Sequence, residues 1–152
     1  MTAVTDQKTR LVSQLINSCY RAQDGYKTAA STVEDHTLRR LFEIYAQQRT
    51  RFAEELREYL PYEAATETNY ASGLALEDTE NGRDSIRECL EIDSRTLALY
   101  KEALSHRALP TRAHFLISAQ LALLQRVHDR MNGMFDQRVA GRSCLQEQRI
   151  SA

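Results

Sequence analysis

The fold is decided by the stretch Ile86-Arg-Glu-Cys-Leu-Glu-Ile-Asp-Ser-Arg-Thr-Leu-Ala-Leu-Tyr-Lys-Glu-Ala-Leu104. Its apolar residues recur every three or four positions, which at about 100° per residue places them on one face of a helix. That face comprises Ile86, Leu90, Asp93, Leu97, Tyr100 and Leu104, with Cys89 at its edge. A carboxylate within an apolar face costs several kcal/mol to desolvate unless a cation, a metal or a hydrogen-bond donor contacts it. We therefore expect the other helices to supply a partner for Asp93, and the identity of that partner to indicate the function.

The composition is that of an all-helical, single-domain protein. The 152 residues include only 5 Gly, 2 Pro and no Trp, while the strong helix formers Ala, Leu, Glu, Gln and Arg are abundant. A chain of this length can bury a core without disulfides. The 3 cysteines are an odd number without the spacing of a disulfide framework, so we expect reduced thiols.

Charge and hydropathy disfavour nucleic acid and membranes as partners. The net charge is −1 and both signs are mixed along the chain, so there is no basic field to attract a polyanion. Residues 1–8 contain no apolar signal core, and no run approaches the roughly 18 apolar residues of a membrane span. We expect a cytoplasmic protein.

Hydrophobic periodicity predicts four helices in one domain. They span about residues 6–33, 36–60, 84–105 and 111–138, within a domain of residues 1–138. Asp35 is the expected N-cap of the second helix, which ends before Pro61. Residues 139–152 lose the periodicity, and we expect a mobile tail.

The connection between the second and third helices predicts the topology. Residues 61–83 are a long segment of mixed polar composition, whereas an antiparallel return needs only a few residues. A connection of this length can travel along the whole bundle and start the third helix parallel to the second. The sequence therefore predicts an all-α four-helix bundle with a long crossover between helices 2 and 3.

Each predicted helix carries polar residues near its midpoint. They are Gln23 on the first, Gln48 and Arg49 on the second, Asp93 on the third, and Gln120 and His128 on the fourth. Di-iron bundles hold at these levels one Glu from each of two helices and a Glu-x-x-His pair from each of the others. Here glutamines and an arginine replace most carboxylates. Asp93 and His128 alone are too few ligands for a closed metal site.

Three interpretations of this polar layer stay open. In the first, Arg49 contacts Asp93 as a charge-assisted pair, and Gln48 and Gln120 satisfy the remaining polar atoms. In the second, Asp93 and His128 hold a metal that water or a second subunit completes. In the third, the layer binds a small ligand that the sequence does not identify.

Other residues have mainly structural interpretations. Tyr26, Tyr45 and Tyr100 face inward at helical spacing, which is typical of core packing with the hydroxyl bound to a partner. Gly25 lies inside the first helix, where it costs about 1 kcal/mol relative to Ala, and indicates a close helix contact. The absence of a glycine-rich phosphate loop and of a nucleophile elbow argues against nucleotide and acyl-transfer chemistry.

Several motifs together resemble a known family. They are Asp24-Gly-Tyr-Lys-Thr-Ala-Ala30, Gln47-Gln-Arg49, Phe52-Ala-Glu-Glu-Leu56, Glu88-Cys89, Asp93, Gln120 and His128-Asp-Arg130. The combination resembles a bacterial ferritin-like, or rubrerythrin-like, four-helix-bundle family classed as a domain of unknown function, over about residues 11–135. The resemblance implies a ferritin-like fold without an established activity. Members tend to carry Glu where this chain has Gln23 and Asp93, and an acidic residue at Leu90, so the resemblance implies a degenerate di-iron site.

The sequence thus predicts a non-enzymatic ferritin-like protein without a cofactor. We expect it to act through assembly as a homo-oligomer, such as a dimer, or through binding of a partner other than nucleic acid or a membrane. A role in stress physiology rests on analogy alone. The alternative is an oxidoreductase or metal-storage protein that binds iron or another divalent metal. It would use Asp93, His128, Gln48 and Gln120.

Overall fold

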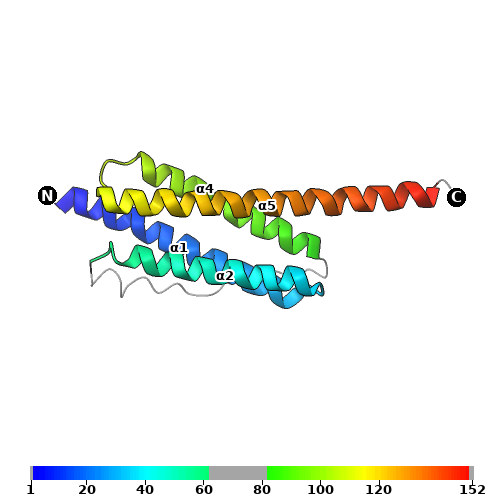
Figure 1. The fold of residues 1–152 in the computed structure, drawn as a ribbon. Coiled ribbons are helices and arrows are strands. Elements are labelled where there is room, and N and C mark those ends of the chain that lie inside the picture. Colours follow the sequence, from blue (N-terminus) through cyan, green and yellow to red (C-terminus); the bar gives the residue numbers. More distant parts are fainter. Residues whose placement is uncertain (1, 62–81, 151–152) are drawn as a thin grey trace.

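The computed structural model describes the backbone of residues 2–61 and 82–150, and the side chains of residues 7–61 and 86–137 (Figure 1). These residues form four helices and no strand: α1 (Thr2–Thr32), α2 (His36–Arg57), α4 (Gly82–Ser105) and α5 (Thr111–Ile150). The predicted all-α architecture with four helices is confirmed for this part of the chain. None of its helices combines the length and the apolar character that crossing a membrane requires.

The helix boundaries differ from the predicted ones mainly at the C-terminus. The sequence predicts an end near residue 138, whereas α5 continues to Ile150. Residues 139–150 lack a regular apolar pattern in the sequence but contain the strong helix formers Arg, Gln, Leu and Ala, which favour a helix. The predicted mobility of residues 139–152 stays a prediction.

The start of α2 follows its predicted cap. The side chain of Asp35 accepts hydrogen bonds from the backbone N–H groups of Thr37 and Leu38, at 2.9 and 3.2 Å. These two donors have no partner within the helix, and the carboxylate also interacts favourably with the helix dipole. At the other end, the N–H groups of Tyr59 and Leu60 bond to carbonyls three residues earlier, so the chain tightens into a turn before Pro61.

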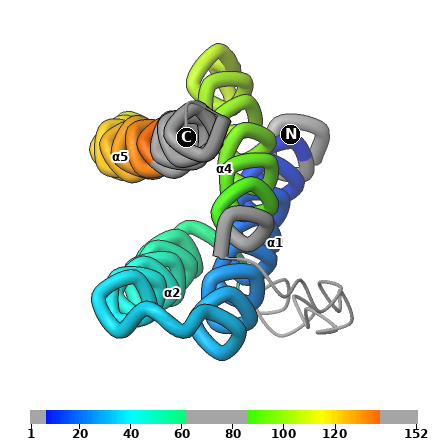
Figure 2. Tube along the Cα trace, turned by 90° about the vertical axis from the view of Figure 1, so that its right-hand side faces the viewer, coloured from blue at the N-terminus to red at the C-terminus, as the bar shows by residue number. Residues whose placement is uncertain are grey.

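The four helices pack as neighbours around a common core. α1 packs against α2 on one side and α4 on the other, and α4 packs against α5, whereas α2 and α5 contact each other only slightly (Figure 2). α2 and α4 run in the same direction, opposite to α1 and α5 (Figure 1). The connection between α2 and α4 falls largely on residues 62–81, outside the described residues. The ferritin-like crossover therefore stays a prediction.

The apolar core consists of two clusters on either side of a polar level. One cluster includes Leu15, Leu56 and Ile117, and the other includes Phe42, Ile86 and Met131. On α2 and α4, the buried residues Arg49 and Asp93 stand between the members of the two clusters. The fold thus places one charged pair between two apolar clusters.

Candidate functional site

The centre of the bundle holds a bidentate ion pair between α2 and α4. Arg49 and Asp93 are only 0% and 1% exposed. Arg49 Nη1 donates to Asp93 Oδ1 at 2.9 Å, and Nη2 donates to Oδ2 at 3.1 Å. Two parallel charge-assisted hydrogen bonds fix both the distance and the relative rotation of the two helices. The structure therefore brings together the two charges that sequence analysis paired.

A tyrosine from α1 completes this pair. The Tyr26 hydroxyl donates to Asp93 Oδ2, and the Arg49 guanidinium lies 5.6 Å from the centroid of the Tyr26 ring. The ring of Tyr26 also packs edge-on against Tyr45, with 5.5 Å between centroids. Both oxygens of Asp93 are thereby occupied by donors from two other helices. We call Arg49, Asp93 and Tyr26 the core triad.

A second group of polar side chains links all four helices. The Tyr100 hydroxyl donates to Gln120 Oε1 at 2.6 Å, and Gln120 Nε2 donates to the Phe52 carbonyl at 3.3 Å. Cys19 Sγ lies 3.3 Å from the Tyr100 oxygen. Because the only hydroxyl hydrogen of Tyr100 is directed at Gln120, the thiol is the donor in this contact. The group therefore joins α1, α2, α4 and α5 through neutral hydrogen bonds.

Burial keeps the thiols and phenols of this interior protonated. Desolvation raises the pKa of Tyr26 and of Tyr100 well above their ordinary value. It also raises the pKa of the Cys19 thiol from 9.0 to about 11, and that of Cys89 as well. Burial alone lowers the pKa of Arg49, but the Asp93 carboxylate raises it, so the guanidinium stays charged. At neutral pH these groups supply neither a thiolate nor a phenolate as nucleophile or ligand.

The glutamines of the predicted polar layer do not complete the pair. Gln120 bonds Tyr100 and Phe52 rather than Asp93. Gln23 and Gln48 are half-buried, and Gln48 Oε1 has no hydrogen-bond partner among the described residues. The prediction that Gln48 and Gln120 satisfy the pair is wrong. Tyr26 binds Asp93 instead, and Arg49 Nε has no hydrogen-bond partner among the described residues.

The physical reason lies in helix geometry. Tyr100, which binds Gln120, is seven residues from Asp93 along α4, or about 10 Å at 1.5 Å per residue. Gln120 therefore lies at a different level from the pair. Tyr26 on α1 reaches Asp93 directly. Its inward position was visible in the sequence, but its partner was not.

The two predicted metal ligands have separate partners. Asp93 binds Arg49 and Tyr26, whereas His128 Nε2 lies 3.0 Å from Ser94 Oγ and its Nδ1 lies 3.2 Å from Asn132 Nδ2. Within the described part of the chain, no three His, Cys, Asp or Glu side chains form a group that could hold a metal ion. A buried guanidinium also repels a cation. These residues do not fit a di-iron centre.

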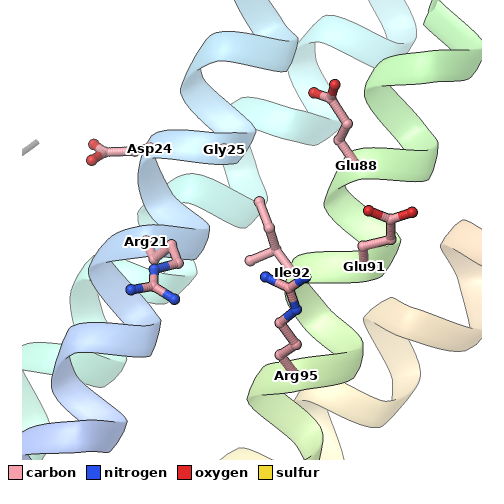
Figure 3. A pocket seen from close by; sticks show the side chains of 7 residues that line it. All are labelled: Arg21, Asp24, Gly25, Glu88, Glu91, Ile92 and Arg95. Carbon is pink, nitrogen blue, oxygen red and sulfur yellow. The ribbon is translucent and has the colours of Figure 1, made fainter. Parts of the chain in front are cut away.

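Two hollows lie on the surface of the bundle. A pocket of about 390 Å³ between α1 and α4 is shown in Figure 3. It is lined by Arg21, Asp24, Gly25, Glu88, Glu91, Ile92 and Arg95. A groove of about 410 Å³ on the α2 and α5 side is lined by His36, Thr37, Arg40, Leu41, Ile44 and Arg130. We call the first the α1–α4 pocket and the second the α2–α5 groove.

Comparison with known families reaches only part of the chain. Residues 9–72 match a family model described as Domain of unknown function (DUF2383). No curated protein matches the chain. The matched segment contains α2 and most of α1, and hence Tyr26 and Arg49, whereas Asp93 and Gln120 lie outside it. The similarity agrees with the predicted likeness to a domain of unknown function, and its ferritin-like character stays a prediction.

Proposed function

We propose that this protein is a non-catalytic, ferritin-like helical bundle with a degenerate di-iron site, and that it acts by assembling with a second copy. The observation that carries the proposal is the occupation of both Asp93 oxygens by Arg49 and Tyr26. A ferritin-like metal centre needs several inward carboxylates. Here the inward carboxylate is neutralised by a cation of the protein itself.

The direction of the helices supports the ferritin-like part of the proposal. α2 and α4 run parallel (Figure 1), as they do in bundles with one long crossover. The core triad then lies between two apolar clusters, inside the bundle, where di-iron carboxylate bundles build their metal sites. The triad acts there as a fixed electrostatic connection that sets the register of three helices.

The α2–α5 groove is the surface that we assign to assembly. Ile44 is 50% exposed at the groove, which it lines together with the partly buried Leu41. Arg40 and Glu43 are both exposed, and they lie on the same side of α2. In a two-fold symmetric dimer with antiparallel α2 helices, Arg40 of one copy would meet Glu43 of the other. A second copy thus supplies the opposite charge and covers Ile44.

Metal analysis tests the absence of a metal centre. The protein is purified without chelator, and its iron, zinc and manganese contents are measured alongside those of Asp93→Asn. We expect less than stoichiometric metal in both proteins, because Arg49 and Tyr26 occupy the carboxylate. A stoichiometric metal in the unmodified protein that is lost in Asp93→Asn would overturn the proposal.

Light scattering tests the assembly. We expect the mass of a dimer for the unmodified protein and that of a monomer for Ile44→Lys, which places a charge in the proposed contact. The matched control is Phe115→Lys, because Phe115 is 71% exposed on α5 and does not line the groove. It is expected to leave the dimer intact. A monomeric unmodified protein, or equal effects of the two substitutions, would contradict an assembly through this groove.

A further inference from the structure

We propose that the α1–α4 pocket binds a small linear zwitterion, with its carboxylate between Arg21 and Arg95 and its ammonium group near Glu88 and Glu91. This inference goes beyond the proposed assembly and does not depend on it, because the pocket lies on different helices from the α2–α5 groove. It also differs from a ligand in the buried polar layer, since the pocket opens to solvent.

The cationic end of the pocket is formed by two arginines that face each other across two helices. α1 and α4 run antiparallel, and the contacts of Tyr26 with Asp93 and of Cys19 with Tyr100 place Arg21 within about one helical turn of the level of Arg95. Figure 3 shows their guanidinium groups at the same end of the pocket, one on each side. Like charges at facing positions repel each other. An anion between them removes the repulsion.

Exposed ion pairs join Arg51 with Glu55 and Arg87 with Glu91, and neither pair includes Arg21 or Arg95. Asp24 is one turn from Arg21 on α1, but its carboxylate points away from α4 (Figure 3). A carboxylate ligand suits this position, because guanidinium groups bind planar carboxylates through two parallel hydrogen bonds.

The acidic end of the pocket excludes most simple anions and favours a second, positive group. Glu88 and Glu91 line the pocket on α4 towards its N-terminal end. Together with Asp24, these two glutamates outnumber the two arginines by one charge. The formal charge of the pocket is therefore −1, which disfavours a polyanion. Glu91 already contacts Arg87 at 3.7 Å, but both side chains are exposed, and an ammonium group can replace such a weak pair.

The spacing of these charges indicates the length of the ligand. Along α4, Glu91 and Glu88 precede Arg95 by four and seven residues, which corresponds to about 6 and 10 Å at 1.5 Å per residue. An extended peptide spans about 3.3–3.6 Å per residue, so two or three residues cover this distance. The volume of about 390 Å³ is also in the range of small-molecule sites. A dipeptide or tripeptide with free ends is therefore the class of ligand that fits.

The floor of the pocket is apolar and rests on the core triad. Ile92 extends into the space beside Gly25 (Figure 3). Glycine inside a helix costs about 1 kcal/mol relative to alanine, and here its missing side chain leaves room beside Ile92. Gly25 and Ile92 are the sequence neighbours of Tyr26 and Asp93, whose hydrogen bond holds the two walls in place. The pocket is thus open but rigidly supported.

Titration followed by NMR tests the site. The probe is L-alanyl-L-alanine, added to the ¹⁵N-labelled protein, and backbone amide shifts are followed. We expect saturable shifts that are largest at residues 21–25 and 88–95. N-acetyl-dialanine lacks the ammonium group and dialanine amide lacks the carboxylate, so both are expected to bind at least about tenfold more weakly. Inorganic phosphate is added as the simple anion.

Substitutions separate the two ends of the pocket. Arg95→Gln and Glu88→Gln are each expected to weaken binding of dialanine about tenfold or more. The matched control Arg10→Gln removes an exposed arginine of α1 outside the pocket and is expected to leave binding unchanged. Circular dichroism verifies that each variant is folded.

Three results would overturn the proposal. The first is the absence of saturable shifts with dialanine. The second is binding of phosphate or N-acetyl-dialanine as tight as that of dialanine, since the acidic end would then contribute nothing. The third is an equal loss of binding in Arg95→Gln and Arg10→Gln, which would indicate a general charge effect.

Discussion

The contact between Arg49 and Asp93 fixes the arrangement of the helices more than it adds to stability. Both charges leave water completely, and the loss of hydration offsets much of their attraction. What the pair provides is a unique arrangement, because two hydrogen bonds of 2.9 and 3.1 Å are satisfied at only one register of α2 and α4. Tyr26 extends this constraint to α1 through the second oxygen of Asp93.

The substitution Tyr26→Phe isolates the contribution of one hydroxyl. It removes a donor to a buried carboxylate while keeping the ring, so we expect the free energy of unfolding to fall by about 1.5–3 kcal/mol. Urea denaturation followed by circular dichroism measures the change. Tyr59→Phe serves as the control, because Tyr59 is half-buried at the end of α2. A similar effect of both substitutions would refute a specific role for the Tyr26 hydroxyl.

At the scale of single helices, α2 matters most because it carries Arg49. Its first turn is held by Asp35, which accepts from the N–H groups of Thr37 and Leu38. The same helix begins directly after α1, so the cap also fixes the angle of the connection. A displacement of this start would move Arg49 relative to Asp93.

Removal of this cap is expected to destabilise the protein moderately. Asp35→Ala leaves two N–H groups without their side-chain acceptor, and we expect a loss of about 0.5–2 kcal/mol. The midpoint of thermal unfolding gives the measurement. Glu34→Ala changes an exposed acid next to the cap and is expected to have a much smaller effect. If Asp35→Ala leaves the midpoint unchanged, the cap is not a determinant of α2.

The sequence was informative about elements and less so about their ends and their contacts. Periodicity predicted four helices because each buries one apolar face, and Arg49 could be paired with Asp93 because both interrupt such faces. The extent of α5 was missed because the sequence of its last residues lacks the apolar periodicity on which the prediction relied. The partner of Tyr26 was missed because it depends on how far α1 is rotated and shifted against α4, which no local pattern encodes.

At the scale of the whole molecule, buried thiols and phenols make the stability of the protein decrease at alkaline pH. The pKa values of Cys19, Cys89, Tyr26 and Tyr100 are raised by burial. Above the ordinary thiol pKa of 9.0, the unfolded chain loses protons that the folded protein keeps. Stability therefore falls as the pH rises through 9 towards about 11, and it is fully present below 9.

We expect the urea concentration at the midpoint of unfolding to decrease steadily between pH 8.5 and 11, because the unfolded chain loses protons in this range that the folded protein keeps. Denaturation curves at fixed ionic strength measure this decrease. Cys89→Ala removes one of the titrating groups, and we expect a shallower decrease in this variant than in the unmodified protein. A midpoint that does not change with pH over this range would contradict neutral, buried thiols and phenols.

A double-mutant cycle on Arg49 and Asp93 tests the central claim most directly. Free energies of unfolding are measured for the unmodified protein, Arg49→Met, Asp93→Asn and the double variant. Each single substitution leaves the other polar partner buried without its counterpart, so we expect each to cost about 3–5 kcal/mol and the double variant to cost far less than their sum. Additive costs, within about 0.5 kcal/mol, would show that the two side chains do not act as a pair and would contradict the account.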